Sequence, residues 1–319
     1  MSPTSTGQPL RLGTRGSALA LAQAQTVADE VRRFTGRPVD LVPIRTAGDT
    51  QAEPLDVIGG TGVFTTAVRE ALTRGEVDLV VHSLKDLPTA PADGIALAAV
   101  PRREDPRDAL CSKAGRRLAE LPAGARVGTG SPRRAAQLRW RRPDLDVVGL
   151  RGNVDTRLRR LTADGDLDAV VLARAGLVRL HRLDSVTESL DADTMLPAPG
   201  QGALAVECRA DATSLRDLLA ELDHPASRAA VLAERALLAA LEAGCTAPVG
   251  ALAELSADSP AAGPEPVLHL SAAVVSIDGA TAVRMSASGP AGAPQQLGES
   301  LAAALLADGA AALLGERVR

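Results

Sequence analysis

Short apolar runs alternate with amphipathic stretches through the first two thirds of this 319-residue chain. The runs have the length of strands, and the stretches between them repeat apolar residues at helical spacing. Such alternation favours parallel sheets joined by right-handed crossovers. The predicted strands are Leu10–Leu12, Val39–Ile44, Asp78–His82, Arg126–Gly128, Asp146–Leu150 and Asp168–Ala173. The predicted helices include Ala18–Arg33, Phe64–Arg74 and a helix from Ser131 through Arg142.

The same pattern predicts a division of the chain into three parts. Two similar α/β units come first, and connections rich in proline near residues 101–107 and 197–202 mark the crossings between them. After residue 223 a long Ala/Leu helix and alternating strands indicate a smaller α+β domain. We therefore predict two doubly wound α/β domains, residues 1–103 with 201–222 and residues 104–200, and a third domain, residues 223–319.

Composition excludes several classes of protein. Aromatic residues are nearly absent, with one Trp, two Phe and no Tyr, so bases cannot stack on an aromatic platform. The three cysteines, Cys111, Cys208 and Cys245, form neither a C-x-x-C pair nor a disulfide framework. The chain shows no signal-peptide pattern and no long apolar run free of charge. We expect a cytoplasmic protein without a metal, a membrane segment or a nucleic-acid partner.

Positive charge is concentrated in the middle of the chain. The chain as a whole has a net charge of −4, whereas residues 126–160 hold ten Arg and three Asp. A solvated basic helix accounts for the arginines at positions 139, 141, 142, 159 and 160. The other arginines follow predicted strand ends, or lie one turn into the next helix. They are Arg15, Arg133, Arg134, Arg151 and Arg157.

Arginines at strand ends indicate a site for anions. Ligands of open α/β sheets bind at the carboxyl ends of the strands, where helix N-termini also point bare N–H groups. Guanidinium groups match carboxylates in a two-pronged geometry. The chain has neither a Walker pattern nor a G-x-G-x-x-G turn, so phosphate is less favoured. We predict a cleft for a ligand with several carboxylates, and ion pairing within the protein is the alternative.

Two further positions suggest chemistry. Lys85 and Asp86 follow the predicted strand that ends at His82, where a carboxylate could move a proton or stabilise a cation. A surface ion pair is the plain alternative for these two residues. Cys245 lies between Gly244 and a threonine at a helix end, where a thiolate could be reached. Cys111 and Cys208 lie in strand-like runs and are expected to be buried thiols.

Seven segments together resemble the porphobilinogen deaminase (hydroxymethylbilane synthase) family, in the family's order. The resemblance runs essentially from end to end of the chain. The segments are Leu12-Gly-Thr-Arg-Gly-Ser17 with Ala20-Leu-Ala-Gln23, Val80-Val-His-Ser-Leu-Lys-Asp-Leu-Pro88, Arg103-Glu-Asp-Pro-Arg-Asp-Ala109, Gly128-Thr-Gly-Ser-Pro-Arg-Arg134, Leu150-Arg-Gly-Asn-Val-Asp-Thr-Arg-Leu158, Pro199-Gly-Gln-Gly-Ala203 and Glu242-Ala-Gly-Cys245.

The resemblance implies an activity and a cofactor. Four porphobilinogen molecules are joined head to tail, each with loss of ammonia, to give hydroxymethylbilane in tetrapyrrole (haem) biosynthesis. The chain grows on a dipyrromethane cofactor, made from the substrate and held by a thioether to the cysteine that matches Cys245. The fold implied is a pair of α/β domains similar to type II periplasmic binding proteins, with a third domain that carries the cysteine, in a transferase that works as a monomer.

The resemblance also implies roles for single residues. Asp86, with Lys85, is the expected catalytic group, because it can hold pyrrole N–H groups and stabilise the cation left when ammonia departs. For His82 we expect a hydrogen-bonding role. The expected cofactor-binding residues are Cys245, Arg15, Ser17, Ser83, Lys85, Asp86, Thr129, Ser131, Arg133, Arg134 and Arg151. The expected substrate-binding residues are Arg15, Arg157 and Arg179.

The chain departs from the family pattern at three positions. Many members have two lysines in a glycine-rich loop where this chain has Val57 and Thr61, so two cationic contacts are missing or come from elsewhere. Gly130 replaces a common serine, which removes one hydroxyl donor. Two other classes stay open as alternatives. One is an anion receptor of similar fold, which would need no loop thiol, and the other is a nucleic-acid binder that uses the arginine-rich middle segment.

Overall fold

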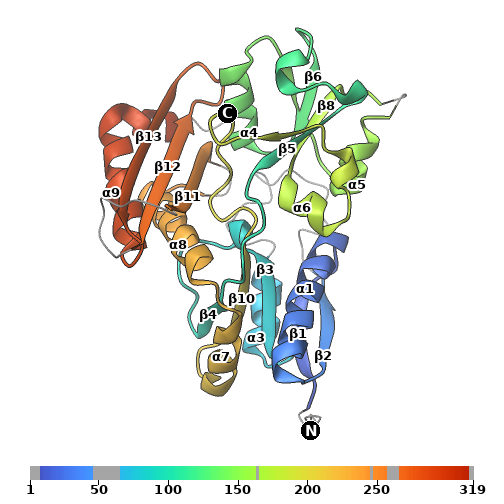
Figure 1. Ribbon diagram of the computed structural model, residues 1–319, viewed down its shortest axis with the longest axis vertical. Helices are drawn as coiled ribbons and strands as arrows, with labels where there is room; N and C mark the ends of the chain where they lie inside the picture. Colours follow the sequence, from blue (N-terminus) through green and yellow to red (C-terminus); the bar gives the residue numbers. More distant parts are fainter. Residues whose placement is uncertain (1–7, 46–64, 163–164, 245–246, 257–265, 316–319) are drawn as a thin grey trace. The chain divides into compact units, whose positions relative to one another are not determined.

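The computed structural model describes residues 8–45, 65–162, 165–244, 247–256 and 266–315 (Figure 1). The chain divides into two compact units. Unit 1 holds Met1–Arg103 and Ala203–Arg228, and unit 2 holds Glu104–Gly202 and Ala229–Arg319. The chain therefore crosses to unit 2 after Arg103, returns to unit 1 at Ala203 and crosses to unit 2 again after Arg228.

Unit 1 contains one five-stranded sheet, called sheet 1. Its strands are β1 (Leu10–Arg15), β2 (Val39–Ile44), β3 (Leu79–Ser83), β4 (Ile95–Ala99) and β10 (Leu204–Arg209). They lie in the order β2-β1-β3-β10-β4. The first three are parallel to one another, and β10 runs antiparallel to both of its neighbours.

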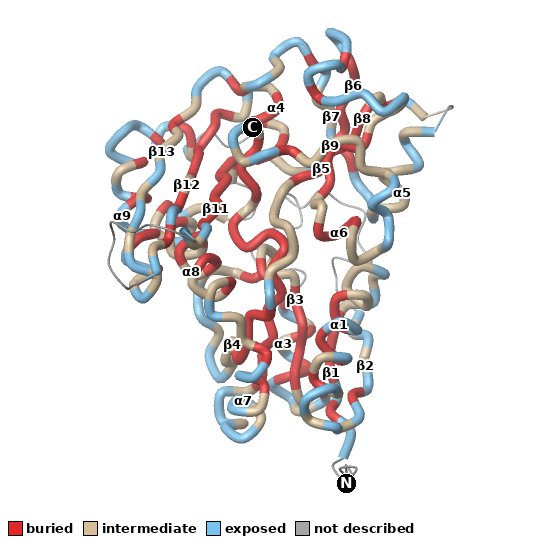
Figure 2. Tube along the Cα trace, in the orientation of Figure 1, coloured by how far each residue is buried: buried red, intermediate tan, exposed pale blue. Residues whose placement is uncertain are grey.

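Helices cover both faces of sheet 1. They are α1 (Ala18–Thr35), α3 (Thr66–Thr73), the 3-10 turns η1 (Leu84–Asp86) and η5 (Ala220–Leu222), and α7 (Thr213–Leu219). The apolar stripe of α1, with Val27 and Val31, packs with Val81 on one face. Leu72 of α3 packs with Val80 on the other. Strand β3 is therefore apolar on both sides and buried along most of its length (Figure 2).

Unit 2 contains a second five-stranded sheet, called sheet 2. Its strands are β5 (Asp108–Ser112), β6 (Arg126–Thr129), β7 (Asp146–Gly149), β8 (Ala169–Ala173) and β9 (Glu188–Leu190). They lie in the order β7-β6-β8-β5-β9. Strands β6, β7 and β8 are parallel, and β5 is antiparallel to β8. Sheet 2 thus repeats the arrangement of sheet 1.

Helices also cover both faces of sheet 2. They are η2 (Lys113–Gly115), η3 (Leu118–Glu120), α4 (Pro132–Arg141), α5 (Val154–Arg159), α6 (Arg174–Arg179) and η4 (Leu183–Ser185). Leu138 of α4 packs with Val127 and Val171 on one face. Leu158 of α5 and Leu177 of α6 belong to the core on the other face. The predicted doubly wound α/β fold is therefore confirmed for both sheets.

The last part of unit 2 is an antiparallel sheet of three strands, called sheet 3. Its elements are β11 (Val249–Ser256), β12 (Val267–Val275), β13 (Ala282–Pro290), α8 (Pro225–Ala240), α9 (Pro294–Leu305), the π-helical turn η6 (Leu306–Ala310) and α10 (Ala311–Leu314). Helices α8 and α9 cover one face of sheet 3 (Figure 1). Ala136 of α4 packs with Val275 on the other. The predicted α+β character of this region is confirmed.

One helical segment, Pro294–Leu314, is long and apolar enough in composition to cross a membrane. Length and composition are weak indications, because the core helix of a globular domain meets the same criteria. Leu301 and Leu305 of this segment are buried in the core of sheet 3. Packing on the sheet therefore accounts for these two side chains.

Both sheets are mixed, where parallel sheets were predicted. The six predicted strands are parallel within each sheet, and the antiparallel strands β5 and β10 were not among them. Strand β5 is the first strand after the chain crosses to unit 2, and β10 is the first after it returns to unit 1. Each runs antiparallel to the strands beside it. The division into three domains stays a prediction, because the compact units join residues 104–202 with the C-terminal region.

Gly202 lets two chain segments approach each other closely at the second crossing. Its φ of +88° favours glycine, and a Cβ there would lie 2.4 Å from the carbonyl oxygen of Glu104. The amide of Glu104 donates to the carbonyl of Gly202 (3.3 Å). The segments that enter and leave the first part of unit 2 are thus bonded to each other.

Candidate functional site

Four of the predicted site residues line one pocket at the carboxyl ends of β1 and β3. Strand β1 ends at Arg15, and Ser17 then caps α1, its Oγ accepting from the amide of Ala20 (3.3 Å). Strand β3 ends at Ser83, and the turn η1 that follows carries Lys85. The pocket is lined by Arg15, Ser17, Leu19, Ala20, Gln23, Thr65, Val81, His82, Ser83 and Asp86.

Gln23 joins the two sides of this pocket. It lies on the buried face of α1, and its Nε2 donates to Oγ of Ser83 (3.1 Å). Asp86 lies three residues farther along, in η1, and is half-buried. The lining of the pocket thus includes one carboxylate, one guanidinium and three hydroxyl side chains, those of Ser17, Thr65 and Ser83.

A buried ionic group lies against the same pocket. Arg69 of α3 forms a two-pronged pair with Glu207 of β10, with Nε 2.9 Å from Oε2 and Nη2 2.6 Å from Oε1. Nε2 of His82 lies 3.5 Å from Oε2 of Glu207. Burial lowers the pKa of His82 to about 4, and this effect outweighs the opposing attraction of Glu207. His82 is therefore neutral at pH 7.

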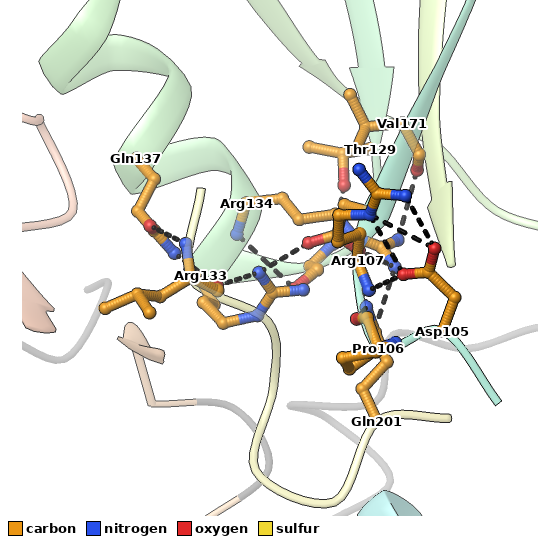
Figure 3. Close-up of polar contacts among 12 residues, drawn as sticks. Asp105, Pro106, Arg107, Thr129, Arg133, Arg134, Gln137, Val171 and Gln201 are labelled. Carbon is orange, nitrogen blue, oxygen red and sulfur yellow. Dashed lines mark hydrogen bonds and ion pairs between the residues drawn. The ribbon is translucent and has the colours of Figure 1, made fainter. Parts of the chain in front are cut away.

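A second buried ionic group surrounds Asp108, the first residue of β5 in sheet 2. Figure 3 shows Arg133, Arg134 and Gln201, which belong to this group. Oδ2 of Asp108 accepts from Nη1 of Arg133 (2.7 Å), and Oδ1 accepts from Nε of Arg134 (2.9 Å). Gln201 donates from Nε2 to the same Oδ1 (2.9 Å). Asp108 and Gln201 are fully buried, and the two arginines are no more than 5% exposed.

The charges of this group do not cancel. Burial disfavours the Asp108 carboxylate, but Arg133 and Arg134 outweigh that penalty and hold the pKa of Asp108 well below its usual value. Burial lowers the pKa of Arg133, and Asp108 opposes that effect. One carboxylate therefore faces two guanidinium groups, and the group keeps one excess positive charge.

Two further predicted arginines add to this positive charge. Arg157 of α5 donates from Nε to the carbonyl of Gly152 (2.8 Å). Burial lowers the pKa of Arg157, and so do the charges of Arg134 and Arg151. None of these influences on Arg157 comes from a carboxylate. Arg151, directly after the core residue Leu150, is exposed.

The hydroxyl residues of unit 2 shape the turn from β6 to α4. Oγ1 of Thr129 accepts from the amide of Ser131 (3.2 Å). Ser131 is the N-cap of α4, and its Oγ accepts from the amide of Arg134. The turn therefore fixes the start of the helix that carries the two buried arginines.

The remaining predicted residues lie apart from these groups or outside the described part of the chain. Arg179, at the end of α6, donates from Nη2 to the carbonyl of Gly202 (2.7 Å). Cys245 and the two positions that depart from the family's loop, Val57 and Thr61, lie outside the described residues. Cys111 and Cys208 are buried as predicted.

Sequence reasoning missed four residues of the two ionic groups. Asp108 and Gln201 lie within motifs of the family, but no role was assigned to them from the sequence. Arg69 and Glu207 lie in none of those motifs. A charged residue inside an apolar strand is the signal that could have found Glu207. In the described part of the chain no three His, Cys, Asp or Glu side chains are grouped as a metal site would require.

Comparisons with known proteins decide the family. Residues 10–217 match the family model "Porphobilinogen deaminase, dipyromethane cofactor binding domain", and residues 228–307 match "Porphobilinogen deaminase, C-terminal domain". The chain belongs to the porphobilinogen deaminase family. Its members are transferases of tetrapyrrole biosynthesis.

Individual relatives agree with the family models. Porphobilinogen deaminase 1 of Streptomyces coelicolor is 58% identical over 284 residues, which are 88% of each chain. Porphobilinogen deaminase of Thermobifida fusca is 58% identical over 277 residues, or 86% of this chain and 84% of the relative. The match thus extends over most of both proteins.

Two solved structures show a weaker likeness to part of this chain. A periplasmic substrate-binding protein of an ABC transporter from Coxiella burnetii is similar with a TM-score of 0.43 and 17% identity, over 69% of this chain and 94% of that one. The methionine binding protein MetQ has a TM-score of 0.43 and 13% identity, over 67% of this chain and 89% of that one.

Proposed function

We propose that this chain is a hydroxymethylbilane synthase. It joins four porphobilinogen molecules head to tail, with loss of ammonia, on a dipyrromethane held by Cys245. The observation that carries the proposal is the excess positive charge at the strand ends of sheet 2. Asp108 compensates one of the two buried arginines beside it, and among the described residues the influences on the pKa of Arg157 are burial and two other arginines. Such a group is suited to a ligand that brings several carboxylates.

The described residues fit the dipyrromethane. Each pyrrole carries an acetate and a propionate, which match the arginines, and pyrrole N–H groups match a carboxylate acceptor. When bound, the dipyrromethane supplies the pyrrole carbon to which the first substrate is joined. We propose as its ligands Cys245, Arg15, Ser17, Ser83, Lys85, Asp86, Thr129, Ser131, Arg133, Arg134 and Arg151. We propose Arg15, Arg157 and Arg179 for the substrate.

Asp86 is the proposed catalytic group. Its carboxylate, in a pocket with Arg15, would accept hydrogen bonds from pyrrole N–H groups and stabilise the cation formed as ammonia leaves. It would also assist the proton transfers of each addition. Lys85, its neighbour in η1, would bind a substrate carboxylate or orient Asp86.

We propose that the enzyme acts as a monomer in the cytoplasm, with porphobilinogen as its partner and with neither a membrane nor a nucleic acid. The net charge of −4 and the near absence of aromatic residues support the last point. Light scattering of the purified protein checks the monomer, and a titration with nucleic acid at two salt concentrations checks the absence of binding.

Intact mass under denaturing conditions tests the proposed function most directly. The purified protein should carry an excess mass of two linked pyrroles, and peptide mapping should place it on the Cys245 peptide. Cys245→Ser should abolish the excess, whereas Cys208→Ser, at a buried cysteine of β10, should keep it. If porphobilinogen added to the wild type produces no adduct, the anion-receptor alternative replaces the enzyme.

A further inference from the structure

We propose that Asp108 and Gln201 are positioning residues of the cofactor site, which hold the guanidinium of Arg134 in the orientation that receives a ligand carboxylate. This inference rests on the proposed function, because it assumes that Arg134 binds the dipyrromethane. Neither residue has been given a role above. The argument starts from the contacts that surround Arg134.

The guanidinium of Arg134 is held from three directions. Nε and Nη2 both lie on Oδ1 of Asp108, at 2.9 and 2.8 Å. Nη1 donates to the carbonyl of Val171 in β8 (3.0 Å), and Nη2 also contacts Oε1 of Gln201 (3.4 Å). A guanidinium has five N–H groups, and these contacts use four of them. Within the described part of the chain, one N–H of Nη1 is left for a ligand.

Gln201 holds the Asp108 carboxylate, which in turn holds the guanidinium of Arg134. Its Nε2 donates to Oδ1 of Asp108 (2.9 Å) and to the carbonyl of Pro106 (2.7 Å), while its Oε1 faces Arg134. An amide side chain can donate two hydrogen bonds, here to a carboxylate and a carbonyl, and accept a third from a guanidinium. A glutamate there would place a second anion against Asp108, and an apolar residue would leave a buried oxygen unsatisfied.

The charge of the group fits a positioning role better than a stabilising one. A buried pair that served stability alone would be neutral, since an uncompensated buried charge is costly. Here one carboxylate serves two arginines, and Nε of Arg133 has no hydrogen-bond partner among the described residues. Asp108 thus orients the arginines and leaves one positive charge for the incoming carboxylates.

The chain offers a matched pair of glutamines for the test. Gln201 and Gln137 are both fully buried and both make hydrogen bonds in unit 2. Gln137 accepts from the amide of Leu196 (2.8 Å) and donates to its carbonyl (3.0 Å), which also accepts from Nη1 of Arg133 (2.6 Å). Among the described residues, neither of these hydrogen bonds of Gln137 involves Asp108 or Arg134. Gln201→Met and Gln137→Met therefore both remove buried hydrogen bonds of an amide side chain, but only the first removes a hydrogen bond to Asp108.

The measurement is the rate at which apo-protein gains the two-pyrrole adduct from porphobilinogen, followed by intact mass, together with the urea midpoint. Both variants should lose stability, Gln201→Met more than Gln137→Met, and both should stay folded without urea. Gln201→Met should load about tenfold more slowly than Gln137→Met, because the hydrogen bonds it loses involve charged groups. Equal loading rates would overturn the positioning role. A wild type that never loads would instead overturn the proposed function.

Asp108→Glu keeps the test decisive if Gln201→Met does not fold. This variant keeps the charge and moves the carboxylate by one methylene, so the excess charge of the group is unchanged. Loading several-fold slower than wild type, at a wild-type far-UV spectrum, supports positioning. Loading at the wild-type rate shows that charge alone suffices and refutes it.

Discussion

The strands of sheets 1 and 2 follow equivalent orders, but the buried ionic groups at their fourth strands differ in net charge. In each sheet the fourth strand, β10 or β5, is antiparallel and carries a buried carboxylate. Glu207 on β10 meets one arginine and a neutral histidine, so its group is neutral. Asp108 on β5 meets two arginines, so its group is cationic. Two sheets of the same topology can therefore hold buried ionic groups of different net charge.

The proposed function places the chemistry in unit 1, at Asp86, and Asp86→Asn is the variant that tests this proposal. The amide keeps the shape and loses the charge, so we expect turnover of porphobilinogen to fall by about 10²- to 10⁴-fold. The fold and the excess charge around Asp108 are untouched. Asp211→Asn, at a carboxylate whose side chain is 87% exposed, is the control and should keep its activity. Native turnover by Asp86→Asn would remove Asp86 from the mechanism.

Removing one arginine from each ionic group sharpens the contrast. Arg69→Met leaves Glu207, whose side chain is only 4% exposed, without its cation, and should lower the free energy of unfolding by about 3–5 kcal/mol. Arg133→Met leaves Asp108 paired with Arg134, so the loss should be only about 1–2 kcal/mol. Urea denaturation followed by circular dichroism measures both. Equal losses would show that the charge difference between the sheets has no energetic consequence.

The neutral histidine of unit 1 predicts a pH dependence. The pKa of His82 is about 4 in the folded protein and about 6.5 in the unfolded chain, so between these values the unfolded chain binds the extra proton. The free energy of unfolding should therefore fall as the pH drops from 6.5 to 4, by about 3 kcal/mol in total. This stability is fully present above pH 6.5.

Two histidine variants isolate that contribution. Urea midpoints at pH 7, 6 and 5 should fall less steeply in His82→Gln than in the wild type. His269→Gln, at an exposed ring in β12, should keep the wild-type slope. The same slope in all three proteins would mean that His82 titrates normally in the folded state.

Much of the fold could be predicted because strand and helix periods are local properties. The apolar runs around β3 and β8 and the amphipathic pattern of α1 lie in the sequence itself. The direction of β5 and β10 could not be predicted in this way. The direction of these strands depends on where the chain crosses between the units. Strand β10, for example, pairs with β3, which lies about a hundred residues earlier in the sequence.

The candidate site was predictable to the same degree. Strand ends predicted where Arg133, Arg134 and Arg151 would lie, since all three follow a strand. The sequence could not distinguish the two buried arginines from the exposed one, because their partner, Asp108, lies about 25 residues away. The role of Cys245 stays a prediction, since that residue lies outside the described part.

The smallest expected effect concerns one glycine in equivalent turns of the two sheets. Gly16 precedes the cap Ser17 of α1, and Gly130 precedes the cap Ser131 of α4. A Cβ at Gly16 would meet nothing within 4 Å, whereas a Cβ at Gly130 would lie 2.4 Å from the carbonyl oxygen of Leu150. The family serine at this position would therefore not simply restore a hydroxyl donor. It would push the backbone that leads into Arg151.

We expect Gly130→Ser to lower the free energy of unfolding by about 1–2 kcal/mol and to slow the loading of the dipyrromethane a few-fold. Gly16→Ser, in the open turn of sheet 1, should cost less in the same urea titration. Faster loading by Gly130→Ser would mean that the hydroxyl matters more than the close approach of Leu150. The two turns would then differ in a hydrogen-bond donor and not in space, and the steric part of the comparison between the sheets would have to be given up.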